Sequence, residues 1–212
     1  MPTASREESQ RLTLDAIVDV AIAMIDADGI GSLSMRKLAD RAGVPTMTLY
    51  GHVATKDELL AAVADRFFAE IELPAEDLAW QEQLKAIFRA VHGVFLRHPE
   101  LAEITARQHL NAMSAFRGAE RTLAALHTAG LGPEEAVSAF VALTSYTTGF
   151  SQRQVRVDES PTVQARRLER LRNLPADEFG HLPALATVFV AGLTDRHFED
   201  GLDLLVRGIA SR

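Results

Sequence analysis

The sequence predicts an all-α fold. Apolar residues recur at helical spacing along the chain, between residues that cap, start or end helices. Strand-like alternation bounded by Asn-Gly or Asp-Gly turns is missing. The 212 residues, 47% of them hydrophobic, provide enough apolar material for a small helical module followed by a larger one, or for a single domain.

Charge and composition limit the possible functions. The net charge of -7 and the pI of about 5.5 argue against an indiscriminate nucleic-acid binder, so any DNA-binding surface must be local. The absence of cysteine excludes disulfides, thiolate metal sites and cysteine nucleophiles, and it fits a protein of the reducing cytoplasm. The polar first residues do not resemble a secretory signal, and we expect a disordered arm over residues 1–9. The longest nearly apolar run, 182–193, is too short to cross a membrane.

The first helices have clear boundary signals. A helix is expected over 14–28, where Thr13 can cap the start and Gly29 can end it. Two short helices should follow, one from the cap at Ser34 to Gly43 and one over 46–52. A Thr-Lys-Asp-Glu capping box at 55–58 then opens a helix that we expect to reach Leu73, just before a proline.

The rest of the chain continues the helical pattern. Helices are expected over 79–97, 99–109, 111–129, 134–155, 183–192 and 196–209. The polar, arginine-rich stretch 157–181 should hold a mobile loop or a short helix.

The two short helices have the features of a helix-turn-helix. Such helices cross closely, so the first needs a small residue and the turn needs a glycine that tolerates positive φ. Ala39 and Gly43 meet these needs. The apolar residues at spacings that would lock the pair are Leu38, Ala42, Val44 and Leu49. The residues left for the outer faces are Thr46, Met47, Thr48, Tyr50 and His52.

Four short runs keep a fixed spacing through this segment. They read LSMRKLA at 33–39, GV at 43–44, LYGHV at 49–53 and KDELL at 56–60. This pattern resembles that of the tetracycline-repressor (TetR) family. Over roughly fifty residues it is far more specific than a bare helix-turn-helix pattern.

The resemblance implies a homodimer that binds double-stranded operator DNA. It places Thr46, Met47 and Thr48 near bases, and it gives phosphate-facing positions to Arg36, Tyr50, His52 and Lys56. A recognition helix does present its N-terminal part to the major groove, while flanking donors hold the DNA backbone. The cations Arg36, Lys37, Arg41 and Lys56 also outweigh Asp40 over residues 32–56, which gives a local positive field.

Two features leave room for another interpretation. Leu49 and Tyr50 could simply pack a three-helix core, with Lys56 as a solvated cap. Gly51 departs from the family, in which many relatives carry a large side chain. A DNA contact would then be missing, and the recognition helix would be weaker by about 1 kcal/mol.

The second half resembles the tetracycline-repressor branch through its two long C-terminal helices. Apolar residues at helical spacing could form a four-helix bundle between two subunits: Val137, Phe140, Val141 and Thr144, with Leu202, Leu205, Val206 and Ile209. An intramolecular core is the alternative.

The predicted larger domain should bind an effector. The magnesium and drug ligands of the tetracycline repressor do not transfer to this sequence, so tetracycline is not expected as the effector. A different small molecule could contact Phe88, His92, Phe95, His109, Met113, Phe116, Tyr146 and Phe150, although each of these could equally belong to the core or to its rim. Six arginines between Arg153 and Arg172 could face an acidic effector or form a solvated basic surface.

Signals of catalysis or metal binding are poor. No two histidines stand three or four residues apart, and there is no nucleophile elbow or phosphate loop. We therefore expect no enzyme, no metal and no cofactor.

The whole pattern predicts a cytoplasmic transcriptional regulator, with repression relieved by an effector as the default mechanism. We expect DNA binding by residues 10–56, a connecting helix over 57–73, and ligand binding and dimerisation by 74–212. Activation remains an option. A small-molecule binding protein with a vestigial DNA module is the alternative function, and an all-α enzyme is a more distant one.

Overall fold

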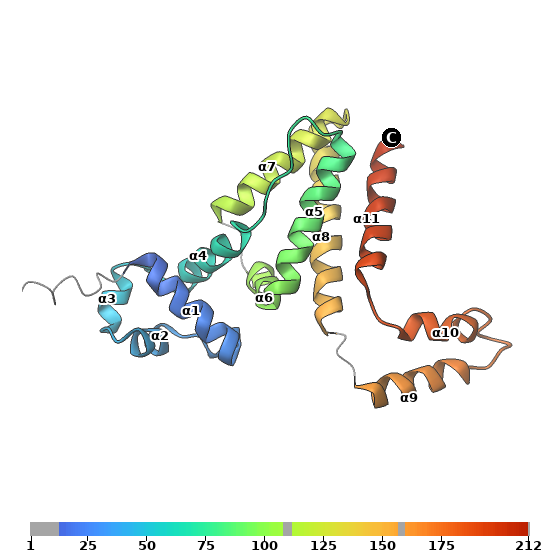
Figure 1. Cartoon of the computed structure of the whole chain (residues 1–212), viewed down its shortest axis with the longest axis horizontal. Coiled ribbons are helices and arrows are strands. Elements are labelled where there is room, and N and C mark those ends of the chain that lie inside the picture. Colours follow the sequence, from blue (N-terminus) through green and yellow to red (C-terminus); the bar gives the residue numbers. More distant parts are fainter. Residues whose placement is uncertain (1–12, 108–111, 157–159, 212) are drawn as a thin grey trace, which may run out of the picture. The chain divides into compact units, whose positions relative to one another are not determined.

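The computed structural model describes residues 13–107, 112–156 and 160–211, and these residues form helices without any strand (Figure 1). The predicted all-α fold is therefore confirmed. In chain order the elements are α1 (Leu14–Asp28), the short 3₁₀ helix η1 (Ile30–Ser32), α2 (Met35–Ala42), α3 (Thr46–Tyr50), α4 (Lys56–Phe68), α5 (Trp80–Arg97), α6 (Pro99–Arg107), α7 (Met113–Thr128), α8 (Pro133–Arg156), α9 (Pro161–Arg172), α10 (Leu182–Val190) and α11 (Asp195–Ala210).

These helices form two compact units. The first unit comprises residues 1–71 and 100–117, and the second comprises residues 72–99 and 118–212. Helix α7 thus begins in the first unit, and its later turns belong to the second. The predicted domain boundaries differ from this division mainly because α6 and the start of α7 group with the N-terminal helices.

Local capping chemistry sets the N-terminal helices. The Thr13 hydroxyl accepts a hydrogen bond from the Ala16 amide at 3.2 Å, and Gly29 ends α1 with φ of 74°. Helix α1 buries an apolar stripe, Ile17, Val18, Ala21, Met24 and Ile25, against η1, α2 and α4. Its predicted bounds are confirmed.

Helix α4 is shorter than predicted. It ends at Phe68 instead of reaching Leu73, and the chain from Ile71 to Leu73 has no regular structure. The proline at 74 restricts only Leu73, the residue directly before it, and does not account for an end at Phe68. The predicted connecting helix stops about one turn early.

Three helices form most of the core of the second unit, and α7 adds Ala125 and Leu126 to it. Helix α5 packs against α8, and α11 packs against both of them. The apolar faces meet around Phe198, which is 1% exposed and lies on α11 one and two turns before the buried Leu202 and Val206. Burial of a phenylalanine at such a position contributes about 1.5–3 kcal/mol to stability.

Two ion pairs fasten α5 to α11 beside this core. Lys85 Nζ lies 2.7 Å from an Asp203 oxygen, and the Arg89 guanidinium donates to both oxygens of Glu199 at 2.6–2.9 Å. The bond to Asp203 raises the pKa of Lys85, and the bond from Lys85 lowers the pKa of Asp203. Both pairs are spaced by one helical turn on each helix, so they fix the axial position of α11 on α5.

A close approach joins α8 to α11. The Tyr146 hydroxyl reaches the α11 backbone and donates to the Phe198 carbonyl oxygen at 2.9 Å and the His197 carbonyl oxygen at 3.2 Å. A Cβ atom at Gly201 would overlap the hydroxyl and the ring of Tyr146. Glycine is therefore required here for its lack of a side chain rather than for its backbone freedom.

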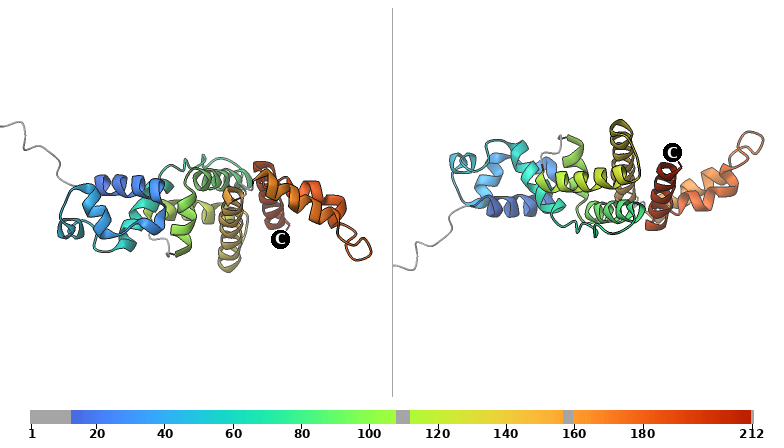
Figure 2. Two further views of the ribbon diagram at one scale, coloured as in Figure 1. Left: turned by 90° about the horizontal axis from the view of Figure 1, so that it is seen from below. Right: turned by 90° about the horizontal axis from the view of Figure 1, so that it is seen from above.

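Helices α9 and α10 lie side by side as a hairpin (Figure 2). Helix α9 forms from the arginine-rich stretch for which a loop or a short helix was predicted, and it has Pro161 at its start. Across residues 13–107, 112–156 and 160–211, no helix combines the length and the apolar character that crossing a membrane requires.

We predict that Gly201→Ala lowers the free energy of unfolding by about 1–3 kcal/mol, because overpacking forces Tyr146 or α11 to move. Gly118→Ala is the matched control: Gly118 is also helical and a Cβ there would meet nothing within 4 Å. The control should be neutral or stabilising by up to about 1 kcal/mol. Urea denaturation of both variants measures the difference, and equal stabilities would contradict the proposed steric requirement.

Candidate DNA interface and sensor core

The helix-turn-helix has the predicted internal geometry. Ser34 caps α2 by accepting from the Lys37 amide at 3.3 Å, and Gly43 ends it in the left-handed region with φ of 69° and ψ of 29°. Leu38, Ala39 and Leu49 are completely buried where α2 and α3 meet. The small residue and the turn glycine therefore allow the close crossing expected from the sequence.

The recognition-helix candidate presents a largely exposed outer face. Met47 is 79% exposed and Tyr50 is 44% exposed, whereas Leu49 between them is buried. The other exposed members of the predicted DNA-binding set are Arg36, Lys37, Thr48 and His52, and Thr46 is half-buried. The exposed Met47 side chain on α3 is available for contact with a partner. The whole set remains the predicted DNA contacts.

The backbone dihedral angles at Gly51 are ones that any residue can adopt. It follows α3 with φ of -69° and ψ of -19°, in the ordinary right-handed helical region. Its amide contacts the carbonyl oxygens of Met47 and Thr48, each at 3.2 Å. A Cβ atom at this position would lie 3.2 Å from the Thr48 carbonyl oxygen, so a larger residue would require a small shift of that backbone oxygen.

Lys56 has a structural bond that the sequence does not reveal. Its half-buried ammonium donates to the Leu33 carbonyl oxygen at 2.6 Å, which ties the start of α4 to the segment before α2. The predicted capping box forms only in part: Thr55 accepts from the Glu58 amide, but Glu58 accepts from the amide of Ala54, one residue before the cap. Lys56 is thus more than the solvated cap of the alternative interpretation, and an ammonium retains further donors for a phosphate.

The end of α4 is held in a similar way. Arg66 pairs with Asp15 at 2.9 Å and with Asp19 at 3.0 Å, so that it joins α4 to α1. Asp65, the adjacent residue, accepts a bond from the Ser114 amide at 2.7 Å. These exposed ion pairs stabilise only modestly, by about 0–1 kcal/mol each.

The predicted effector-binding residues separate into groups. Phe88, His92 and Phe95 are buried on α5, and Tyr146 and Phe150 are partly buried on α8. Met113 and Phe116 belong to the first unit and are 61% and 51% exposed, and His109 lies outside the described residues. The second unit therefore supplies its own aromatic cluster, while the role of the eight residues in ligand binding remains a prediction.

Phe198 lies at the centre of that aromatic cluster. Its ring stacks on the His92 ring with centroids 3.9 Å apart, and the Tyr146 and Phe150 centroids are each 5.6 Å from it. Phe198 was not among the predicted pocket residues. Its spacing of four residues from Leu202 and eight from Val206 was the signal that it shares a buried face with them.

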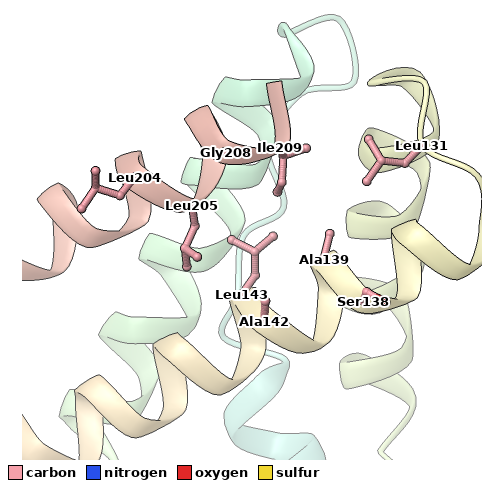
Figure 3. A pocket seen from close by; sticks show the side chains of 9 residues that line it. All are labelled: Leu131, Ser138, Ala139, Ala142, Leu143, Leu204, Leu205, Gly208 and Ile209. Carbon is pink, nitrogen blue, oxygen red and sulfur yellow. The ribbon is translucent and has the colours of Figure 1, made fainter. Parts of the chain in front are cut away.

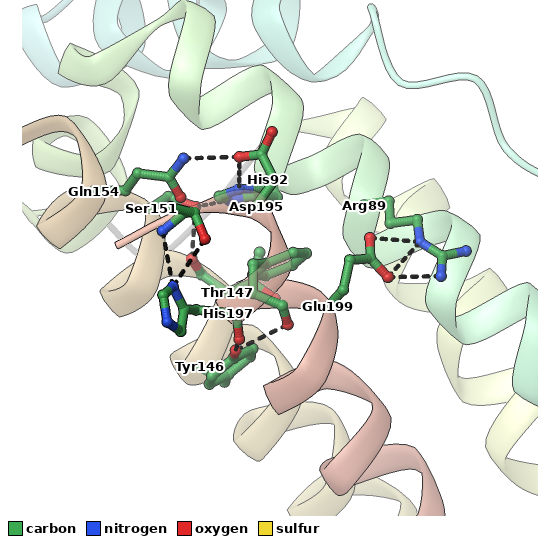
Figure 4. A network of polar contacts seen from close by, with 11 residues as sticks. Arg89, His92, Tyr146, Thr147, Ser151, Gln154, Asp195, His197 and Glu199 are labelled. Atoms are coloured by element: carbon green, nitrogen blue, oxygen red, sulfur yellow. Dashed lines mark hydrogen bonds and ion pairs between the residues drawn. The ribbon is translucent and has the colours of Figure 1, made fainter. Parts of the chain in front are cut away.

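The buried His92 imidazole takes part in a polar network that reaches the exposed Asp195 (Figure 4). The Ser151 hydroxyl donates to the Thr147 carbonyl oxygen at 2.7 Å, and its oxygen also lies 2.7 Å from His92 Nδ1. His92 Nε2 has no hydrogen-bond partner and lies 3.7 Å from an Asp195 oxygen. Gln154 holds that oxygen from the other side at 2.8 Å.

Burial lowers the pKa of His92, and the Asp195 carboxylate opposes this effect without overcoming it. The fold therefore favours the neutral imidazole at His92.

A second feature of this unit is an apolar groove of about 250 Å³ between α8 and α11 (Figure 3). Small and aliphatic residues line it: Leu131, Ser138, Ala139, Ala142, Leu143, Leu204, Leu205, Gly208 and Ile209. Val137, Val141 and Leu204 are each more than half exposed on the same two helices. Leu202 and Val206 instead pack in the core of their own chain, so their predicted place in an intersubunit bundle is wrong.

Within the described part of the chain, no group of three or more His, Asp or Glu residues could hold a metal ion.

We predict that the protein loses stability as the pH falls below 6.5, the ordinary pKa of histidine. Because the folded-state pKa of His92 is lower than this value, the unfolded chain binds more protons in the window between the two. The contribution of His92 is fully present above 6.5 and decreases as the pH falls toward the folded-state pKa. His92→Gln should flatten this part of the profile of unfolding free energy against pH, and an unchanged slope would contradict the assignment.

Comparison with known proteins covers both units. Residues 17–63 match the family described as "Bacterial regulatory proteins, tetR family", and residues 73–212 match "Tetracyclin repressor-like, C-terminal domain". Over 206 residues, the chain is 37% identical to an HTH-type transcriptional regulator of Saccharopolyspora erythraea. The aligned residues cover 94% of this chain and 85% of that protein.

Two further proteins show the same relationship. The HTH-type transcriptional repressor DrrR1 of Streptomyces coeruleorubidus is 33% identical over 192 residues, which cover 89% of this chain and 68% of DrrR1. The structure of the Streptomyces coelicolor TetR family protein ActR in complex with actinorhodin superposes with a TM-score of 0.87, at 33% identity, over 95% of this chain and 98% of ActR. The chain belongs to the TetR family of transcriptional regulators.

Proposed function

We propose that the protein is a homodimeric repressor that binds an operator through α2 and α3 and leaves it when a small molecule binds the second unit. The exposed outer face of α3 on a tightly packed helix-turn-helix carries this proposal. The action would take place in the cytoplasm, where operator DNA lies. DrrR1 is named a repressor, and ActR has been solved with actinorhodin bound.

The DNA-facing roles follow from side-chain chemistry. Thr46, Met47 and Thr48 form the N-terminal part of α3, which a recognition helix inserts into the major groove. Arg36 and Lys37, both exposed in the first turn of α2, supply charge for the phosphates. Arg36 and Lys37 make the surface around the start of α2 locally positive, although the whole chain carries a net charge of -7.

Homodimerisation is proposed through the groove between α8 and α11. A two-fold pairing would cover Val137, Val141 and Leu204, which are otherwise exposed apolar residues on a charged protein. Small residues such as Ala142 and Gly208 in the groove allow helices of a second copy to approach closely. Two linked recognition helices can then read two half-sites.

The effector is proposed to bind near the aromatic residues of α5 and α8. Phe88, His92, Phe95, Tyr146 and Phe150 offer the mixture of apolar surface and a few polar groups that small-molecule sites use. The compound need not resemble tetracycline. Binding would weaken DNA affinity through its preference for one of two dimer geometries.

The test of DNA binding compares two kinds of variant on a duplex that the wild-type protein selects from a random pool. Arg36→Ala should weaken binding to all sequences alike and reduce the salt slope by about 1, because a phosphate contact is lost. Thr48→Ala should cost about 1–3 kcal/mol and relax the preference at one base position.

The control is Arg166→Ala, which removes the same charge from an exposed position on α9. It should leave affinity and salt slope unchanged. If the wild-type protein selects no sequence at any salt concentration, the alternative of a small-molecule binding protein with a vestigial DNA module replaces this proposal.

For the dimer, we predict that Val141→Glu and Leu204→Glu each shift the protein to monomers at micromolar concentration, because a charge cannot be buried unpaired in an apolar interface. Leu78→Glu is the control, since Leu78 is also exposed but lies outside the groove. Light scattering after size-exclusion chromatography gives the mass. A wild-type monomer, or dimers of both groove variants, would contradict the proposed interface.

A further inference from the structure

Ala112, the residue directly before helix α7, has no side chain that could cap the helix. The first amides of any helix lack intrahelical acceptors, and a Ser, Thr, Asp or Asn before the helix commonly provides one. Here the preceding residue is Ala112, whose carbonyl oxygen accepts the first helical bond from the Phe116 amide at 3.1 Å. Its methyl group, 2% exposed, offers no acceptor. Ala112 therefore leaves the first amides of α7 to other acceptors.

The acceptor comes from another helix. Asp65 of α4 accepts a hydrogen bond from the amide of Ser114, the second residue of α7, at 2.7 Å in a partly buried place. A carboxylate at this position also interacts favourably with the positive end of the helix dipole. A bond that would usually lie within one helix therefore connects two helices that are 49 residues apart in sequence.

Helix α4 is connected in turn to the DNA-reading helices. Its first residue, Lys56, donates to the Leu33 carbonyl oxygen directly before the α2 cap, and its last turn carries Arg66, which pairs with α1. Buried Leu59, Val63 and Phe67 pack the helix into the first unit. A displacement of the α4 end would change the support of α1 and α2 together.

Helix α7 leads to the sensor core. Its later turns belong to the second unit, where Ala125 and Leu126 are part of the same apolar core as Phe88 and Phe198. Arg121 fixes this part of the helix by donating to Glu76 at 2.8 Å and to the Pro74 carbonyl oxygen at 2.9 Å. Repacking around the aromatic cluster would therefore act on a helix whose other end Asp65 holds.

We propose that the bond between the Ser114 amide and Asp65 is the contact that transmits a change in the sensor core to the DNA-reading helices. Asp65 is then a positioning residue for operator release, and this inference rests on the proposed function. A stable helix α7 alone does not suffice, because the signal has to reach α4.

Three variants separate capping from transmission. Asp65→Ala removes both the cap and the connection. Asp65→Ala combined with Ala112→Ser returns a capping hydroxyl to α7 but leaves it unconnected to α4. Asp65→Asn keeps an acceptor oxygen at the original place and serves as the conservative control.

Duplex DNA can replace the unidentified effector as the probe, because the coupling between two binding sites is reciprocal. The duplex is the one selected by the wild-type protein from a random pool. Hydrogen–deuterium exchange is measured on the full-length protein, with and without this duplex, in peptides that cover residues 118–128 and 133–156. Melting temperatures of all variants are recorded beside it.

In the wild-type protein and in Asp65→Asn, the duplex should change exchange in these second-unit peptides by about fivefold or more, the lower end of typical allosteric couplings. The double variant should have a restored melting temperature and bind the duplex, yet lose that distant change. The inference is overturned if the double variant keeps the wild-type response, or if the wild-type protein binds the duplex without any response in the second unit. Failure of the wild-type protein to bind any duplex would overturn the proposed function, and this inference with it.

Discussion

The approach of Tyr146 to Gly201 is the constraint on which the second unit depends. It brings α11 so close to α8 that the tyrosine hydroxyl bonds to helix carbonyl oxygens. This position of α11 in turn places Phe198 against His92, and it places Glu199 and Asp203 opposite the cations of α5. Beyond this point, small residues such as Ala142 on α8 and Gly208 on α11 line the groove between the two helices.

Sequence reasoning succeeded where short-range chemistry decides the structure. The caps at Thr13, Ser34 and Thr55 and the turn at Gly43 each involve residues within four positions of one another, so their signals are visible in the sequence. The fold class and the helix-turn-helix followed from them. The end of α4 at Phe68 has no comparable local signal, because the proline at 74 restricts only Leu73 before it.

Long-range partners were beyond that reasoning. The bond from Lys56 to the Leu33 carbonyl spans 23 residues, and the bond from Ser114 to Asp65 spans 49. Periodicity identifies an apolar face but not the surface that covers it, so the sequence left two options open for Leu202 and Val206, a partner subunit and the core of their own chain, where they lie. For the same reason, Met113 and Phe116 were grouped with aromatic residues of the other unit.

The hydrogen bonds and ion pairs of the lysine side chains determine which of them an amine-directed label can reach. The lysines of this arginine-rich chain are Lys37, Lys56 and Lys85. The ammonium groups of Lys56 and Lys85 already bond to Leu33 and Asp203, whereas Lys37 is exposed at the proposed DNA surface. Amine-directed reagents should therefore favour Lys37 among the side chains, which makes mild acylation a footprint of this surface and offers a position for a fluorescent reporter without an added cysteine.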